Sequence, residues 1–139
     1  MVMNTHTTNY ENAFIAVADD CKAINGEVPP TKGAKKSVAN IQFEMISKKP
    51  YQFTSDDVVF GVFAERNDLT EGEFAEARAM FFSKGQPCLR ASPLTKRYGW
   101  GVHSDQNGRI AIYGRETAEY ERLISDKGVK VVKAMKSSR

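Results

Sequence analysis

The sequence predicts an α+β fold in which the elements follow the order strand, helix, helix, helix, strand, strand, helix, strand. Three observations support this order: a short apolar run near the N-terminus, three successive helix-capping signals, and an alternating apolar pattern around an Asp-Gln-Asn-Gly turn. With 139 residues the chain has the usual length of one domain, so we expect residues 1–139 to form a single folded unit.

The first strand is predicted from the segment Asn12 to Ala18, which mixes large apolar residues with alanine and ends at two aspartates that favour a turn. Residues 20–37 follow, with two glycines and the pair Pro29-Pro30, which removes backbone donors and blocks regular structure. We therefore expect a long loop over 20–37, and loops of this length are often functional or mobile.

The first two helices are predicted from residues that cap a helix N-terminus. Ser37 fits the N-cap of a helix over about Val38 to Lys48, and Pro50 ends its apolar periodicity. Thr54 or Ser55 fits the N-cap of the second helix, which two aspartates follow in the first turn.

The third helix begins with a capping box formed by Thr70 and Glu73, and its apolar face continues to a stop at Gly85. Only a short turn separates this helix from the second one. The two helices are therefore expected to pack as neighbours.

A β-hairpin is predicted from Tyr98 onward, where large apolar residues begin to alternate with other residues. The turn Asp105 to Gly108 fits a type I turn followed by glycine in the left-handed region. Such a turn would place Val102 opposite Ile112 and Trp100 opposite Gly114. The large apolar side chains of the hairpin would then share one face.

A short fourth helix after Thr117 and a last strand after Gly128 complete the order, before a basic tail over 136–139. Three helices followed by a hairpin is the order of a winged-helix domain, with residues 50–54 in the place of that fold's short first strand. This resemblance is one of topology and implies no function.

Composition excludes several classes of protein. The longest apolar run is Ala13 to Ala18, whereas a membrane-spanning helix needs about 20 residues. The N-terminus lacks the basic start and apolar core of a signal peptide, so we expect a cytoplasmic protein. Cys21 and Cys88 are expected to be free thiols, and no cluster with metal-ligand spacing is present, so no metal or cofactor is predicted.

The formal net charge of +3 is too small for a dedicated electrostatic nucleic-acid binder, but the charges are unevenly distributed. The stretch from Asp56 to Glu76 carries seven acidic residues against Arg66, and the stretch from Asp126 to Arg139 carries five basic residues against one acid. For each cluster taken alone, a solvated face is the favoured interpretation.

Three segments resemble a bacterial family of small proteins that is described only as a domain of unknown function. They are NTHTTNY at 4–10, PPTKG at 29–33 and CLRASPLTKRYGWGVH at 88–103, with SPLTKRYGWG as the most distinctive part. The resemblance covers nearly the whole chain. It implies a small cytoplasmic protein without an assigned activity or cofactor, and it supplies no catalytic residues.

The segment Arg90 to His103 is the candidate ligand-binding surface, because it combines three cations, three hydroxyls, the only tryptophan, a histidine and two glycines. If both glycines lie on one face of the hairpin, they leave a floor of bare backbone rimmed by Arg and Lys, which suits an anionic or planar ligand. Equally open is the alternative that the glycines make room for an aromatic side chain from the second or third helix. The candidate residues are Arg90, Ser92, Lys96, Arg97, Tyr98, Gly99, Trp100, Gly101, His103 and Tyr113.

The sequence favours a non-catalytic binding module for a small anionic or planar ligand, or for a protein partner, and leaves the oligomeric state open. The first alternative is an enzyme in which His103 acts as a base with Tyr98, Tyr113 or Cys88. The second is a winged-helix-like nucleic-acid binder. It is disfavoured but not excluded, because the third helix carries three glutamates that would repel phosphates.

Overall fold

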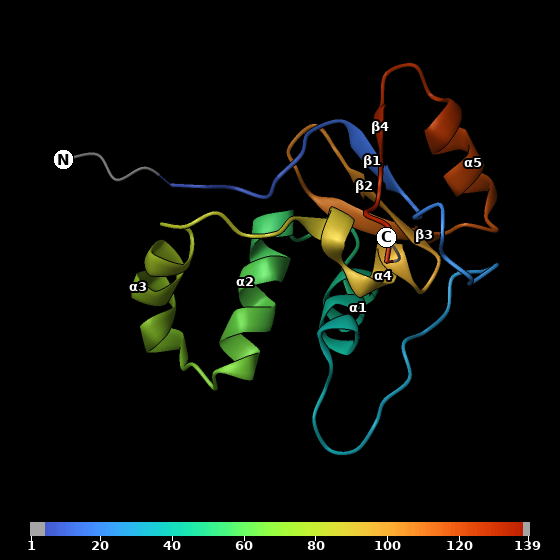
Figure 1. The fold of residues 1–139 in the computed structure, drawn as a ribbon. Coiled ribbons are helices and arrows are strands. Elements are labelled where there is room, and N and C mark those ends of the chain that lie inside the picture. The colour runs from blue at the N-terminus through green and yellow to red at the C-terminus, as the bar shows by residue number, and fades with distance from the viewer. Residues whose placement is uncertain (1–4, 138–139) are drawn as a thin grey trace.

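The structure is a computed structural model that describes residues 5–137, and its main elements follow the predicted order (Figure 1). The α+β class is therefore confirmed. The elements are β1 (Ala13–Ala16), α1 (Val38–Lys48), α2 (Ser55–Arg66), α3 (Glu71–Phe81), the 3-10 turn η1 (Leu89–Ala91), α4 (Pro93–Lys96), β2 (Trp100–Ser104), β3 (Ile110–Gly114), α5 (Ala118–Ser125) and β4 (Lys130–Lys133).

The strands form one four-stranded sheet in the order β3-β2-β1-β4. β1 pairs antiparallel with β2 and parallel with β4, and all four of its residues are buried, as expected for a short apolar run at the centre of a sheet. In the hairpin, Val102 lies opposite Ile112 and Trp100 opposite Gly114, so the predicted register is confirmed. Gly108 has the predicted left-handed backbone, with φ 76°.

Capping residues set the helix starts, as the sequence predicts. Ser37 caps α1 and accepts a hydrogen bond from the backbone N–H of Asn40, while the Asn40 side chain accepts one from the backbone N–H of Ser37. Thr54, not Ser55, is the N-cap of α2, and Thr70 forms the predicted capping box with Glu73 at α3.

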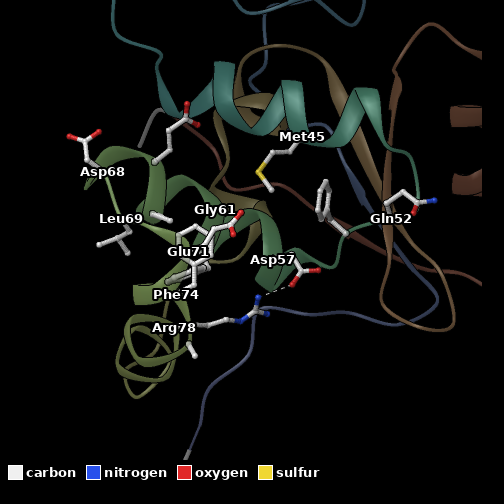
Figure 2. A pocket seen from close by; sticks show the side chains of 14 residues that line it. Met45, Gln52, Asp57, Gly61, Asp68, Leu69, Glu71, Phe74 and Arg78 are labelled. Atoms are coloured by element: carbon white, nitrogen blue, oxygen red, sulfur yellow. Dashed lines mark hydrogen bonds and ion pairs between the residues drawn. The ribbon is translucent and has the colours of Figure 1, made fainter.

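The helices α2 and α3 lie side by side, which confirms that they pack as neighbours (Figure 2). Their contact is made largely of aromatic rings: Phe60 and Phe63 of α2 lie 5.8 Å and 4.8 Å from Phe81 between ring centroids. Arg78 of α3 also donates to Asp57 at the start of α2 over 2.9 Å. No residue of α3 itself is buried, so this helix stands outside the main core.

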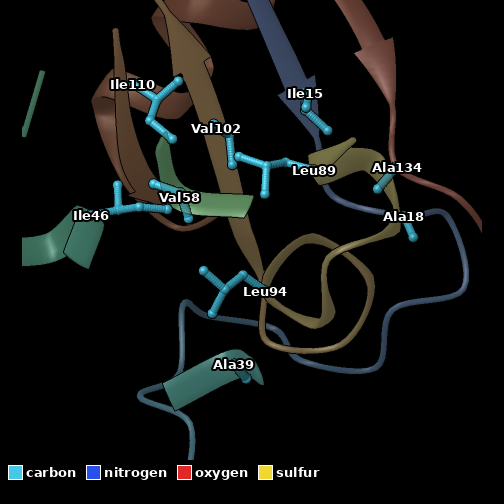
Figure 3. Packing of buried hydrophobic residues seen from close by; sticks show 10 residues of the cluster. All are labelled: Ile15, Ala18, Ala39, Ile46, Val58, Leu89, Leu94, Val102, Ile110 and Ala134. Atoms are coloured by element: carbon cyan, nitrogen blue, oxygen red, sulfur yellow. The ribbon is translucent and has the colours of Figure 1, made fainter. Parts of the chain in front are cut away.

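Both faces of the sheet are covered. One face packs against α1, α4 and the start of α2 through a cluster that includes Ile15, Val102 and Leu94 (Figure 3). The opposite face packs against α5, where Phe14 of β1 meets the ring of Tyr120 edge-on at 5.0 Å. The sheet is thus a middle layer, with α5 on one side and the other helices on the other side.

The N-terminal segment is fastened to the start of α2. Asp56 is buried there and accepts hydrogen bonds from the Thr7 hydroxyl and from both the backbone N–H and the hydroxyl of Thr8. In return, the backbone N–H of Asp56 donates to the side chain of Asn9 over 2.8 Å. These contacts hold the chain in place before it enters β1.

Two predictions about elements need correction. No helix was expected between residue 85 and the hairpin, but η1 and α4 lie there, with Ser92 as the N-cap of α4 and Pro93 in its first turn. A serine followed by a proline, as at Ser92-Pro93, is a recognisable helix start. The hairpin pattern was also expected to include Tyr98, but β2 begins only at Trp100.

The winged-helix resemblance is not confirmed. Its wing would be a hairpin at the end of a small sheet, whereas β2 is paired along its inner edge with β1. In place of the expected first strand there is a single bridge between Thr54 and Arg109. Of the predicted basic tail, residues 138–139 lie outside the described residues. Over residues 5–137, no helix has the length and apolar character needed to cross a membrane.

Candidate functional site

The two glycines of the candidate segment are covered by other parts of the chain. A Cβ atom on Gly101 would lie 2.2 Å from Cζ of Phe14 and 2.8 Å from Cε2 of Tyr120. A Cβ atom on Gly99 would lie 2.4 Å from the backbone oxygen of Asn25. The expectation of a bare floor open to a ligand is therefore corrected: these glycines make room for an aromatic pair and for the loop.

The segment's other residues are placed in different surroundings. Arg90 donates from Nε to the backbone oxygen of Lys133, and Ser92 is buried, where its hydroxyl donates to the side chain of Gln42. Trp100 packs on the ring of Phe43 and donates from Nε1 to the backbone oxygen of Glu27. Arg90, Ser92 and Trp100 thus have structural partners and do not point together into one site.

Lys96 and Arg97 do lie together, at the C-terminal end of α4. With Lys22, Asp20 and Ser137 they line a groove of about 600 Å³, which we call the basic groove. The parallel pairing of β1 with β4 brings Ser137 here, and its backbone N–H donates to Asp20 over 2.9 Å. Within residues 5–137, no ion pair is formed by Lys22, Lys96 or Arg97.

Tyr98 lies beside a smaller hollow of about 210 Å³, whose lining also includes Lys32, Lys35 and Lys36 at the start of α1. The backbone oxygen of Tyr98 accepts from Glu27 and so helps to anchor the loop. Tyr98 therefore contributes to a surface different from that of its neighbour Arg97.

His103 and Tyr113 are brought together on the α5 side of the sheet by Tyr51, which sequence reasoning missed. The Tyr51 hydroxyl lies 2.8 Å from Nδ1 of His103 and 2.8 Å from the Tyr113 hydroxyl, so the three side chains form one hydrogen-bonded chain. We call this chain the tyrosine–histidine cluster. Tyr51 has φ 60°, a left-handed conformation that bulky residues rarely adopt.

Burial changes the acid–base properties of this cluster. It lowers the pKa of the His103 imidazole below its usual value; Asp105 opposes this effect and Arg122 adds to it. Burial, together with the hydrogen bond to Tyr113, raises the pKa of Tyr51. At neutral pH the His103 ring and the Tyr51 hydroxyl are therefore uncharged.

The two hydrogen bonds of this cluster can run in either direction along the chain of side chains. In one arrangement Tyr113 donates to Tyr51, and Tyr51 donates to Nδ1 of His103. In the other, Nδ1 of His103 donates to Tyr51, Tyr51 donates to Tyr113, and Nε2 of the neutral ring is an acceptor. Switching between these arrangements moves a proton from one end of the chain to the other. The cluster thus has the parts of a proton relay.

Another hollow, of about 980 Å³, lies between α1, α2 and α3 (Figure 2). We call it the α1–α2–α3 groove. Met45 reaches down from α1 onto Gly61 of α2, where a Cβ atom would lie 2.8 Å from the Met45 sulfur. Aromatic and aliphatic side chains form most of the wall, and carboxylates lie at its rim. The lining includes Phe53, Phe60, Ala64, Leu69, Phe74 and Ala75, with Glu65, Asp68 and Glu71.

Sequence signals for this groove exist but are weak. A glycine inside a helix costs about 1 kcal/mol relative to alanine, so Gly61 indicates a close approach of another group. Phe74 directly follows the acidic first turn of its helix. Tyr51 has no such signal, because only tertiary folding brings it to His103.

The remaining candidates for chemistry stay apart. Cys88 is a free thiol 3.6 Å from the Tyr10 hydroxyl, and Cys21 is also free, so the expectation of unpaired cysteines is confirmed. Neither thiol lies in the tyrosine–histidine cluster. Among residues 5–137, no three His, Cys, Asp or Glu side chains gather closely enough to hold a metal ion.

A model described as a family of unknown function, DUF6157, matches residues 5–139. The chain belongs to the DUF6157 family. The expected membership of a family without an assigned function is thereby confirmed. No curated protein and no solved structure matches the chain. The DUF6157 family has no described activity, so a function can be inferred only from the residues of this chain.

Proposed function

We propose that this protein is a non-catalytic binding module for a small anionic ligand, which it holds in the basic groove. The observation that supports this proposal is the meeting of Lys22, Lys96 and Arg97 around one hollow of about 600 Å³. Of the ten residues predicted from sequence, Lys96 and Arg97 are retained as ligand contacts. No cofactor or metal enters the proposal.

The charges at the groove favour an anion. Three cations meet one lining carboxylate, Asp20, and Asp19, the residue before it in the sequence, is paired with Lys133 over 2.9 Å. Arg97 offers forked donors that match a carboxylate or a phosphate, and the lysines add point charges. A ligand that carries a phosphate or two carboxylates would therefore be held best.

The test is a thermal-shift and calorimetry screen with inorganic phosphate, a dicarboxylate and a nucleoside monophosphate at low ionic strength. We expect a ligand from this set to raise the melting temperature of the native protein. The double substitution Lys96→Ala and Arg97→Ala removes two charge-assisted hydrogen bonds and should weaken binding about tenfold or more.

A matched control is the double substitution Arg109→Ala and Lys127→Ala, which removes one arginine and one lysine that are exposed outside the groove. Equal loss of affinity in both double variants would show a general charge effect and would refute the basic groove as the site. Absence of binding by the native protein to all three probes would also refute it.

A second candidate function is acid–base catalysis, which the geometry of the tyrosine–histidine cluster favours. Tyr51, His103 and Tyr113 are partly exposed and hydrogen-bonded in series, and burial keeps the His103 ring neutral at neutral pH. In this version His103 acts with Tyr113, as the sequence analysis allowed, while Tyr98 and Cys88 lie elsewhere. The basic groove remains first, because it combines charge with space for a ligand.

Nucleic-acid binding through α3 is the least favoured function. The helix is exposed, but Glu71, Glu73 and Glu76 all lie on its exposed surface and would repel phosphates. A direct binding assay at low salt remains its test.

A further inference from the structure

The loop over residues 20–37 presents two aliphatic side chains to solvent. Ile24 is 80% exposed and Val28 is 68% exposed, which places them among the most exposed large apolar residues of the chain. Exposed apolar side chains close together in sequence often mark an interaction surface.

The backbone around these two residues is held firmly. Arg115 donates to the backbone oxygen of Ala23 over 2.7 Å, and the side chain of Glu116 accepts from the backbone N–H of Gly26 over 2.8 Å. Glu27 accepts from Trp100, and the Asn40 side chain donates to the backbone oxygen of Pro29 over 3.0 Å. The ring of Trp100 also packs closely on Gly26.

This anchoring affects the cost of binding. A mobile loop loses conformational freedom when a partner immobilises it, and that loss reduces affinity. Here hydrogen bonds at Ala23, Gly26, Glu27 and Pro29 have already fixed the backbone on both sides of the two exposed side chains. The loop therefore presents a largely preformed apolar surface.

The charge around the loop is positive. Residues 22–36 carry four lysines against the single acid Glu27. Of these lysines, Lys36 is paired with Glu44, whereas Lys32 and Lys35 form no ion pair within residues 5–137.

The α1–α2–α3 groove has the complementary properties. Its wall is mainly apolar, and Phe74 is 38% exposed there. At its rim, Asp68 and Glu71 have no ion-pair partner in the part of the chain that is described, and Glu65 has only Lys36 at 3.8 Å. The lining also contains Arg78, but its charge is paired with Asp57. The groove thus offers apolar contacts together with negative charge.

We propose that Ile24 and Val28 of one copy of this chain dock into the α1–α2–α3 groove of a second copy. The lysines of the loop then face the carboxylates at the rim of the groove. Each copy has one loop and one groove, and the two surfaces differ, so the contact is heterologous. Association of this kind continues to larger assemblies unless a ring closes.

The test measures molar mass by analytical ultracentrifugation over a range of protein concentrations. The native protein should rise above its monomer mass of 15.5 kDa as concentration increases. The loop variant, Ile24→Ser with Val28→Ser, removes the two aliphatic side chains that the contact between copies would bury. It should therefore associate at least about tenfold more weakly. Added salt should also weaken association, because the charges at the contact are complementary.

A groove variant and its control separate the acceptor site from a general surface effect. Ala75→Lys places a long cation on the groove wall, where it blocks the space and repels the loop lysines. Ala79→Lys makes the same change one turn later on α3, at an exposed position outside the lining. We expect Ala75→Lys to stay monomeric and Ala79→Lys to associate like the native protein.

Mixing the loop variant with the groove variant gives the decisive measurement. The loop variant keeps an intact groove and the groove variant keeps an intact loop, so the mixture should form a 1:1 dimer that grows no further. The proposal fails if the native protein stays monomeric at every concentration, if Ala75→Lys and Ala79→Lys behave alike, or if the mixture yields no dimer. Unchanged circular dichroism confirms that each variant is folded.

Discussion

At Gly101 the backbone of β2 passes directly beneath the rings of Phe14 and Tyr120. The distances of 2.2 Å and 2.8 Å from a built Cβ atom leave no room for any side chain. The same rings meet edge-on at 5.0 Å, and the Tyr120 hydroxyl accepts a hydrogen bond from the backbone N–H of Val17 over 2.9 Å. Tyr120 therefore cannot move away without losing a buried hydrogen bond.

We expect Gly101→Ala to destabilise the fold by about 1–3 kcal/mol, because the added methyl overpacks the space between the sheet and α5. A matched control is Gly72→Ala in α3, where nothing lies within 4 Å of a built Cβ atom. That change should be neutral or stabilising by up to about 1 kcal/mol, since alanine favours a helix. Urea denaturation measures both, and a neutral Gly101→Ala would contradict the packing described.

His103 should make the stability depend on pH. Because burial lowers its pKa in the folded state, the unfolded chain binds the proton more readily. The stabilisation is complete above the unfolded pKa of about 6.5 and is lost as pH falls through the lowered folded pKa. Asp105 and Asp126 limit the effect, and Arg122 increases it.

The measurement is the unfolding free energy of the native protein and of His103→Gln between neutral and acidic pH. The native protein should lose more stability on acidification than the variant, which lacks the titrating ring. Parallel curves would mean that His103 titrates normally, and they would remove the argument for a neutral proton relay at this cluster.

At the scale of elements, the start of α2 has two roles. Its first turn anchors the N-terminal segment through Asp56, and its exposed side forms one wall of the α1–α2–α3 groove. The second aspartate of the pair, Asp57, holds α3 in place through Arg78. Burial alone would raise the pKa of Asp57, but hydrogen bonds from Thr54 and Arg78 outweigh it and lower that pKa.

We expect Asp56→Ala to cost about 2–4 kcal/mol of unfolding free energy, because it leaves the buried backbone N–H and hydroxyl of Thr8 without their acceptor and also removes the bond to the Thr7 hydroxyl. Glu76→Ala serves as the control, since Glu76 is exposed on α3 and should change stability by less than about 0.5 kcal/mol. Chemical denaturation compares the two. A small effect of Asp56→Ala would show that the N-terminal segment contributes little to the fold.

At the scale of the whole molecule, the loop over 20–37 contributes to both proposals, through Lys22 in one and through Ile24 and Val28 in the other, but the variants that test them change different residues. The basic groove is formed by α4, the start of the loop and the residues after β4. The α1–α2–α3 groove exists because α3 packs against α2 and buries no residue of its own. Loss of anion binding in one variant therefore carries no implication for self-association, and the reverse also holds.

Local chemistry explains why the sequence predicted the elements well. Ser37, Thr70 and the Asp-Gln-Asn-Gly turn act on neighbouring backbone groups, so their effect can be recognised without knowledge of the rest of the fold. The pair Ser92-Pro93 was an equally local signal for α4, and the sequence analysis did not use it. The hairpin register likewise followed from one short turn.

The sequence by itself determined the α+β class, the element order, the bounds of α1 and the pairing of the hairpin, because each depends on residues close together in the chain. Tertiary structure alone decided the surfaces. It covered Gly101 with Phe14 and Tyr120, joined Tyr51 to His103, and opened a groove beside α3. These contacts join residues far apart in sequence, and no local preference specifies which distant side chain will fill a given space.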